Sequence, residues 1–251
     1  MTLRLAAIAA LLVLAGCDAS EPGTADGAPA LIAPAAFTLD TEAFPDANAR
    51  VGAGAHFVNA AARVGLVSTV VGLRLVLPKA ATAAATRDQP TVADGEWVWR
   101  STVDVFGTSV DLRLKAAPDG STVRWRLVST ADDGEPFTYY TATTSLDGQT
   151  GSWRLFSPDA AGAVLTADFD VRGADGGEVT FAVPNGLENG GSSVRYVTDG
   201  DDLTFDWLDQ PEADRALIEW DRATRAGSIT ADTYNGGARA CWNAALEDVA
   251  C

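Results

Sequence analysis

The stretch from Trp97 to Leu127 reads WVWRSTVDVFGTSVDLRLKAAPDGSTVRWRL, and its pattern decides the fold class. Apolar and polar residues alternate in three runs, which Gly107-Thr108 and Asp119-Gly120 separate. Alternation with a period of two is typical of strands that bury one face, and short connections that contain glycine favour hairpins. The stretch therefore predicts three antiparallel strands in sequence order.

These two turns also predict how the strands pair. The first turn places Val103 opposite Leu112, and the second places Leu114 opposite Trp125. Both hairpins then bring apolar residues together on one face, as a sheet with one buried side requires. The other face of the same strands carries the polar and charged side chains.

Alternating runs continue to the C-terminus and are separated by further turns of the same kind, for example Asp199-Gly200. Residues 89–251 are therefore expected to form a mainly β domain, an antiparallel meander of about nine to eleven strands. So many strands in sequence must curl or close. The expected architecture is a curved sheet or an open barrel.

Residues 41–88 differ from the strands because their apolar residues recur at steps of three and four. This spacing predicts a helix whose apolar stripe packs on the sheet, with Asp46 or Asn48 as the cap of its first turn. In outline, such a helix against a curved sheet is similar to periplasmic lipoprotein carriers and lipid-binding half-barrels, a likeness of architecture without a shared motif. A ligand pocket in this architecture should be apolar and lie between helix and sheet.

The first residues of the chain have the pattern of an export signal. Arg4 precedes an apolar run from Leu5 to Leu14, which is too short to cross a bilayer and fits the apolar region of a signal peptide. The run ends in Leu14-Ala15-Gly16-Cys17, which resembles the lipobox of bacterial lipoproteins. The resemblance implies a signal peptide over residues 1–16, cleavage before Cys17, and acylation of Cys17, for example with palmitate. An ordinary secretory signal with a chance cysteine is the alternative.

This resemblance also implies a location. The protein would be held in the bacterial cell envelope by its lipid, facing the periplasm or the cell exterior, with the membrane as its partner. Residues 17–40 would follow as the lipidated cysteine and a flexible tether, because the segment is rich in Ala, Pro, Gly and acidic residues. An exported protein meets an oxidising compartment, so Cys241 and Cys251 are expected to form a disulfide that pins the C-terminus. A metal site is the alternative for this pair, although further soft ligands are missing nearby.

The chain is acidic, with a net charge of −16, which disfavours nucleic acid as a partner. Against this background, basic residues gather on the outward side of the first three strands. The predicted register lines up one row across the strands and places a second pair opposite each other beside it. The row is Arg100, Lys115 and Arg124, and the pair is Arg113 and Arg126. Like charges placed opposite are unfavourable, so these five residues are a candidate anion-binding site; the alternative is a solvated face that acids such as Asp104 and Asp111 neutralise.

The sequence names no catalytic residue, metal site or cofactor. His56 is the single histidine and lies in the predicted helix, and the common motifs for hydrolysis and phosphate binding are absent. The seven tryptophans are expected to pack the core, with a carbohydrate platform as the alternative. These observations favour a non-catalytic binding or carrier lipoprotein for an apolar or amphipathic ligand such as a lipid. Two alternatives are an envelope structural or surface-interaction protein without a pocket, and a glycan-acting hydrolase with two carboxylates in a cleft.

Overall fold

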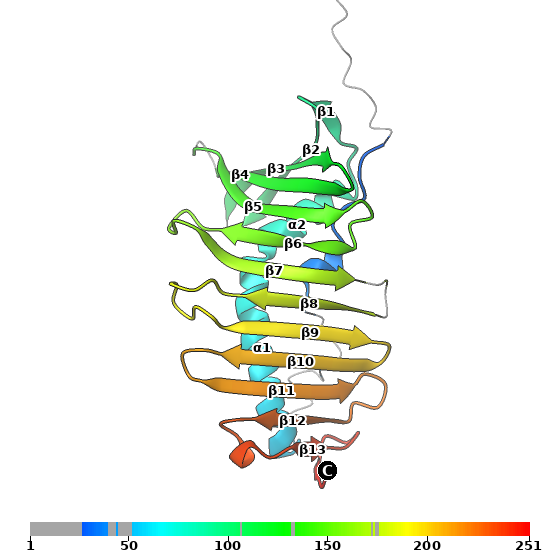
Figure 1. The fold of residues 1–251 in the computed structure, drawn as a ribbon, viewed down its shortest axis with the longest axis vertical. Coiled ribbons are helices and arrows are strands. Elements are labelled where there is room, and N and C mark those ends of the chain that lie inside the picture. Colours follow the sequence, from blue (N-terminus) through cyan, green and yellow to red (C-terminus); the bar gives the residue numbers. More distant parts are fainter. Residues whose placement is uncertain are drawn as a thin grey trace, which may run out of the picture.

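The structure is a computed structural model, and it describes residues 27–39, 44, 52–105, 107–131, 134–171, 173 and 176–251. The predicted signal peptide over residues 1–16 and the lipidation site Cys17 lie outside these residues. Within the described part the protein is mainly β, with a single antiparallel sheet whose inner face is covered by two helices (Figure 1).

Fourteen strands follow one another in the sheet in sequence order, and each pairs only with its sequence neighbours. The eleven strands from β2 to β12 have five or more residues, whereas β1, β13 and β14 have two or three, so the predicted range covers the longer strands. No pairing joins β1 to β14 in the described part, so the sheet is open. The strands are β1 (Thr91–Ala93), β2 (Glu96–Val105), β3 (Thr108–Asp119), β4 (Thr122–Ala131), β5 (Phe137–Ser145), β6 (Thr150–Phe156), β7 (Ala163–Val171), β8 (Gly176–Ala182), β9 (Ser193–Asp199), β10 (Asp202–Asp209), β11 (Asp214–Asp221), β12 (Gly227–Ala231), β13 (Ala240–Trp242) and β14 (Asp248–Val249).

The register of the first two hairpins differs from the prediction by two residues. Each two-residue loop is displaced by one position from the predicted dipeptide, which moves the pairing by two and keeps every side chain on its predicted face. In the second hairpin Asp119 stays in the strand, and Gly120 takes the first loop position with a φ of 63°, which glycine adopts without strain. The pairs found are Val103–Val110 and Leu114–Leu127, in place of Val103–Leu112 and Leu114–Trp125.

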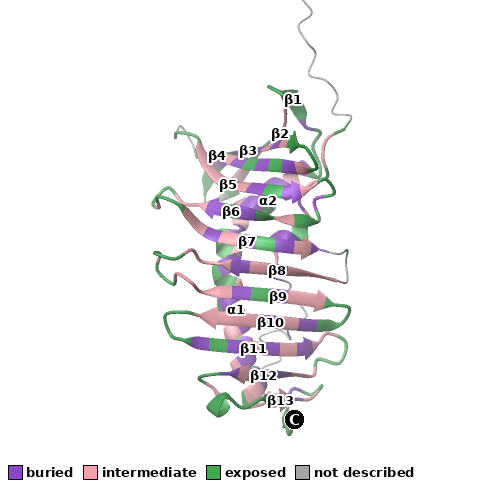
Figure 2. Cartoon of the chain, in the orientation of Figure 1, coloured by how far each residue is buried: buried purple, intermediate pink, exposed green. Residues whose placement is uncertain are grey.

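Inward residues of the strands form one core with the helices, and buried and exposed residues alternate along the strands (Figure 2). Trp99, Trp125 and Trp153 belong to this core, and so do Trp220 and Trp242. The interpretation of most tryptophans as core residues is therefore confirmed.

Two helices replace the one predicted for residues 41–88: α1 (Ala55–Arg74) and α2 (Val76–Ala85). The break at Leu75 follows from Pro78, which has no N–H to donate to the carbonyl of Arg74 and tolerates only the first turn of a helix. That carbonyl instead accepts a hydrogen bond from the Tyr139 hydroxyl, at 3.0 Å. The two helices run across the strands, with α1 against β12 to β14 at one end and α2 against β2 and β3 at the other (Figure 1).

By length and composition alone, α1 is apolar enough to cross a membrane. The core helix of a folded domain has the same character. In this chain α1 buries Phe57, Ala61 and Val64 in the common core, and it contacts β12 and β13. We therefore treat α1 as part of the folded domain.

The first turn of α1 is capped from the other end of the chain. Asp248 accepts hydrogen bonds from the backbone N–H groups of Ala55 (3.0 Å) and His56 (2.9 Å). Gly54 precedes the helix because a Cβ there would collide with Asp248. Asp46 and Asn48, the caps predicted from the sequence, lie outside the described residues. Helix α1 begins at Ala55, and a residue nearly two hundred positions away supplies its cap.

Replacing Asp248 with alanine is expected to lower the free energy of unfolding by about 1 kcal/mol, because two N–H groups of the first turn lose their acceptor. Urea denaturation followed by circular dichroism measures this change. Asp159→Ala is the matched control, because Asp159 is an exposed acid in the turn between β6 and β7. An equal loss in both variants would contradict the capping role.

The stretch before the helices departs most from the prediction. Gly27 to Leu39 was expected to be part of a flexible tether over residues 17–40, yet Ile32, Ala36 and Phe37 are buried. A short 3-10 helix, η1 (Pro34–Phe37), inserts Phe37 into the core, with ring centroids 5.8 Å from Trp153. The tether prediction is wrong for this stretch, because three apolar residues suffice to dock a segment that has no periodic pattern.

Candidate functional site

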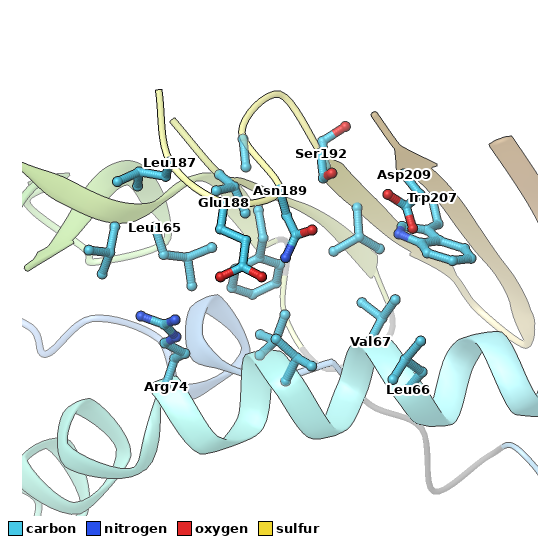
Figure 3. Close-up of a pocket in the computed structure, with 18 residues that line it drawn as sticks. Leu66, Val67, Arg74, Leu165, Leu187, Glu188, Asn189, Ser192, Trp207 and Asp209 are labelled. Carbon is cyan, nitrogen blue, oxygen red and sulfur yellow. The ribbon is translucent and has the colours of Figure 1, made fainter. Parts of the chain in front are cut away.

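The middle of the inner sheet face is hollow. The helices contact the sheet closely at β12 to β14 and at β2 and β3, and between these contacts a cavity of about 470 Å³ separates the second half of α1 from strands β7 to β10. The connection from Val183 to Ser192 borders the cavity on the sheet side (Figure 3). This is the place where the sequence expected a pocket.

Branched aliphatic side chains dominate the lining. Val67 and Val71 of α1 are buried there, whereas Leu66 and Val70 line the cavity with 59% and 54% of their surface exposed. The cavity is therefore open along one side of the helix. The apolar residues from the sheet side are Val164, Leu165, Phe181, Ala182, Val183, Leu187, Val194 and Trp207.

Charged groups stand at the ends of the cavity. Glu188 extends toward α1 on the same side as Arg74, while Asp209 lies beside Trp207 at the other end (Figure 3). Asn189 adds an amide between them. This arrangement suits a ligand with an apolar body and a polar end, because the polar groups sit where water also reaches.

Arg74 is the last residue of α1, and a side chain of the sheet fixes its backbone. The Tyr139 hydroxyl donates to the Arg74 carbonyl, so β5 fixes the last turn of the helix. Burial raises the pKa of Tyr139 above its ordinary value, while the positive charge of Arg74 opposes this effect. The phenol therefore keeps its proton at neutral pH and remains a donor.

The connection between β8 and β9 is fixed by its own backbone. The N–H of Val183 donates to Ser192 and the N–H of Gly191 donates to Val183, each at 2.9 Å. Gly191 has a φ of 87°, which a residue with a side chain rarely adopts. These bonds hold Leu187 and Glu188 at the border of the cavity.

The basic residues singled out in the sequence lie on the outer face of the sheet, away from the cavity. Their pairing differs from the prediction because of the two-residue change in register: Arg100 lies opposite Arg113, and Lys115 lies opposite Arg126. Arg124 lies opposite Ala117, so the predicted row of Arg100, Lys115 and Arg124 is not formed.

The acids that contact these cations are not the expected ones. Glu96 lies 3.2 Å from Lys115 and 3.6 Å from Arg126, and Asp119 lies 3.3 Å from Arg124. Asp111 instead accepts a hydrogen bond from Thr102 at 2.7 Å. Neutralisation by neighbouring acids is thus partial and comes from other carboxylates than Asp104 and Asp111.

A polar cluster joins the first half of α1 to the last strands. Arg63 contacts Asp214 at 3.1 Å and Thr233 at 2.8 Å. His56 shares a hydrogen bond of 2.8 Å with the Tyr234 hydroxyl. These bonds connect the helix to the sheet, so we assign the cluster a structural role.

The structure pairs Cys241 with Cys251 in a disulfide, with Cα atoms 5.3 Å apart, as the sequence predicted. Among the residues that the structure describes, His, Cys, Asp and Glu form no group of three or more that could hold a metal ion. Comparison with family models, with curated proteins and with solved structures finds no match to the chain. What the cavity can bind therefore follows from its own side chains.

Proposed function

We propose that the protein is a membrane-anchored lipoprotein of the bacterial cell envelope that binds or carries an apolar or amphipathic ligand without changing it chemically. The observation that carries this proposal is the apolar cavity of about 470 Å³ between α1 and strands β7 to β10. Its size falls within the range of roughly 300–1,000 Å³ that is usual for small-molecule sites.

The side chains favour a flexible aliphatic chain as the part of the ligand that enters. Valine and leucine dominate the walls, and most of the lining offers no hydrogen-bond partner. A polar head group would stay near Arg74 and Glu188, because the guanidinium group can bind an anionic head group and the carboxylate a cationic one. We therefore propose a single-chain amphiphile such as a fatty acid or lysolipid as the ligand class.

The N-terminal motif supports the location. Acylation of Cys17 in Leu14-Ala15-Gly16-Cys17 would hold the domain at a membrane, where acyl chains are abundant. A carrier that is fixed beside its source of ligand needs only modest affinity, because the local concentration is high.

Native mass spectrometry of the protein purified from the cell envelope without denaturation is the first test. The expected result is an additional mass that disappears on extraction with organic solvent. An unchanged apoprotein mass, also after incubation with a lipid extract, would contradict the proposal.

Replacing Val70 with tryptophan is expected to weaken binding of a fluorescent fatty acid by about tenfold or more, because the larger side chain fills the open side of the cavity. A fluorescence titration measures the dissociation constant. Leu73→Trp is the matched control: Leu73 lies on the same helix with 61% of its surface exposed, but it does not line the cavity. Equal affinities of the two variants would refute binding in this cavity.

A second candidate is the surface-interaction role. Leu66, Val70 and Leu73 are exposed at three- and four-residue steps of α1, so they form one apolar stripe, and a contiguous exposed apolar surface is typical of contact sites. The clean apoprotein mass described above, together with a partner lost in Leu73→Ser and Val70→Ser and kept in Val92→Ser on β1, would favour this candidate.

A further inference from the structure

A second hollow, of about 460 Å³, lies on the outer face of the sheet. Two neighbouring rows of outward residues across strands β3 to β6 form it. One row contains Ala117, Arg124, Thr143 and Ser152, and its three short side chains leave space above the sheet. The other row contains the cations Lys115, Arg126 and Arg154 together with Thr141. The helices cover the opposite face, so one small ligand does not fill both hollows.

The charge of this hollow is positive in a chain whose net charge is −16. Four cations line it, Lys115, Arg124, Arg126 and Arg154, against one carboxylate, Glu96. Glu96 is shared, because both Lys115 and Arg126 lie within ion-pair distance of it, whereas Arg124 pairs with Asp119 beside the hollow. Arg154 is exposed and has no ion-pair partner among the described residues.

The other half of the same face is built differently. Arg195 lies 2.7 Å from Glu178, and Arg215 lies 2.7 Å from Asp206, each with two hydrogen bonds to the carboxylate. Cations on these later strands thus have their own carboxylates. The surplus of positive charge at β3 to β6 is a local property and does not follow from the general composition of the face.

We propose that this outer hollow is a binding site for a phosphate group. Guanidinium groups bind phosphate with two parallel hydrogen bonds, and Arg126 and Arg154 lie on either side of Thr141 in the same outward row, both lining the hollow. The hydroxyls of Thr141, Thr143 and Ser152 are further donors to phosphate oxygens. A phosphate anion offsets the repulsion among cations that Glu96 leaves partly unpaired.

Two sources supply this chemistry: the head group of an anionic phospholipid and a soluble phosphate ester. The proposal rests on the outer face alone and is independent of the ligand proposed for the inner cavity. Loss of fatty-acid binding in Val70→Trp would therefore leave phosphate binding intact.

The test compares two double variants that change the net charge equally. Arg126→Ser/Arg154→Ser removes the two flanking guanidinium groups, and Arg195→Ser/Arg215→Ser removes two cations that have their own carboxylates. The full chain is assayed with soluble polyphosphate by calorimetry and with phosphatidylcholine vesicles that do or do not contain phosphatidylglycerol by sedimentation. Vesicles without phosphatidylglycerol measure the sedimentation that a lipid anchor alone causes.

The expected result is binding of at least one phosphate probe by the unaltered protein, about tenfold weaker in Arg126→Ser/Arg154→Ser and unchanged in the control variant. Binding to phosphatidylglycerol vesicles alone identifies a lipid head group, and binding to polyphosphate shows that soluble phosphate groups are sufficient. Equal weakening in both variants, or no binding of either probe, would overturn the proposal. Both pairs of arginines are exposed, so both double variants should remain folded at the assay temperature, which a thermal denaturation checks.

Discussion

Replacing Phe37 with alanine is expected to lower the free energy of unfolding by about 3–5 kcal/mol, the usual cost of removing a large aromatic side chain from a core. Phe37 has 1% of its surface exposed and contacts the rings of Tyr140 and Trp153. The substitution also weakens the support of η1, whose Ala36 carbonyl accepts a hydrogen bond from the Trp153 indole at 3.1 Å.

Urea denaturation followed by tryptophan fluorescence measures this change, and it also distinguishes two views of the segment. A flexible tether would tolerate Phe37→Ala without loss of stability, whereas a docked segment would not. Ala35→Ser is the matched control, since Ala35 is exposed within the same short helix. A change below about 1 kcal/mol for Phe37→Ala would contradict the docked position.

Replacing Asp214 with alanine is expected to cost a similar amount, about 3–5 kcal/mol, because it leaves the charge of Arg63 buried without its partner. The Asp214 side chain exposes only 9% of its surface and the Arg63 side chain only 15%. Asp214 also accepts a hydrogen bond from the backbone N–H of Thr233 at 3.2 Å, so the turn after β12 loses an acceptor as well.

Thermal and urea denaturation of three further variants isolates the cause. Arg215→Ser breaks the neighbouring ion pair with Asp206, which lies at the surface, and should cost at most about 1 kcal/mol. The double variant Arg63→Met/Asp214→Leu should recover most of the stability that Asp214→Ala loses, whereas Arg63→Met alone should not. If Asp214→Ala were as mild as Arg215→Ser, the pair would not anchor α1 to the sheet.

The fold class was accessible from the sequence because alternation along a strand reports directly on the two faces of a sheet. Within the stretch from Trp97 to Leu127, the alternation predicts the correct face of the sheet for the paired strand residues that the structure describes. Its register was not accessible, because a loop displaced by one residue changes the pairing by two and preserves the faces. The two registers differ in the place of Asp119, which is a strand residue paired with Thr122 and not a loop residue with a positive φ.

Contacts between remote segments were beyond the reach of local patterns. Asp248 caps α1 and Phe37 enters the core, but the residues next to each of them in the sequence do not indicate which segment it contacts. The break between the helices is different: Pro78 was visible in the sequence, and its missing N–H could have indicated the end of α1 near Arg74.

The candidate sites were predictable to different extents. An apolar cavity between helix and sheet follows from the helical stripe and the meander together, but Leu187 and Trp207 come from segments without a predicted register. On the outer face, five cations were named and Arg154 was missed. The alternation of β6 could have found it, because Trp153 faces the core and its neighbour must therefore face outward.

The cap of α1 by Asp248 has a consequence for how the chain assembles. Every strand pairs with its sequence neighbour, so the sheet consists of short-range steps that can form one hairpin at a time as the chain emerges. Helix α1 is made before any of these strands, yet its first turn contacts the last ones. The first turn of α1 therefore obtains its cap only after Asp248 has been made, and the disulfide between Cys241 and Cys251 closes the short loop that contains this residue.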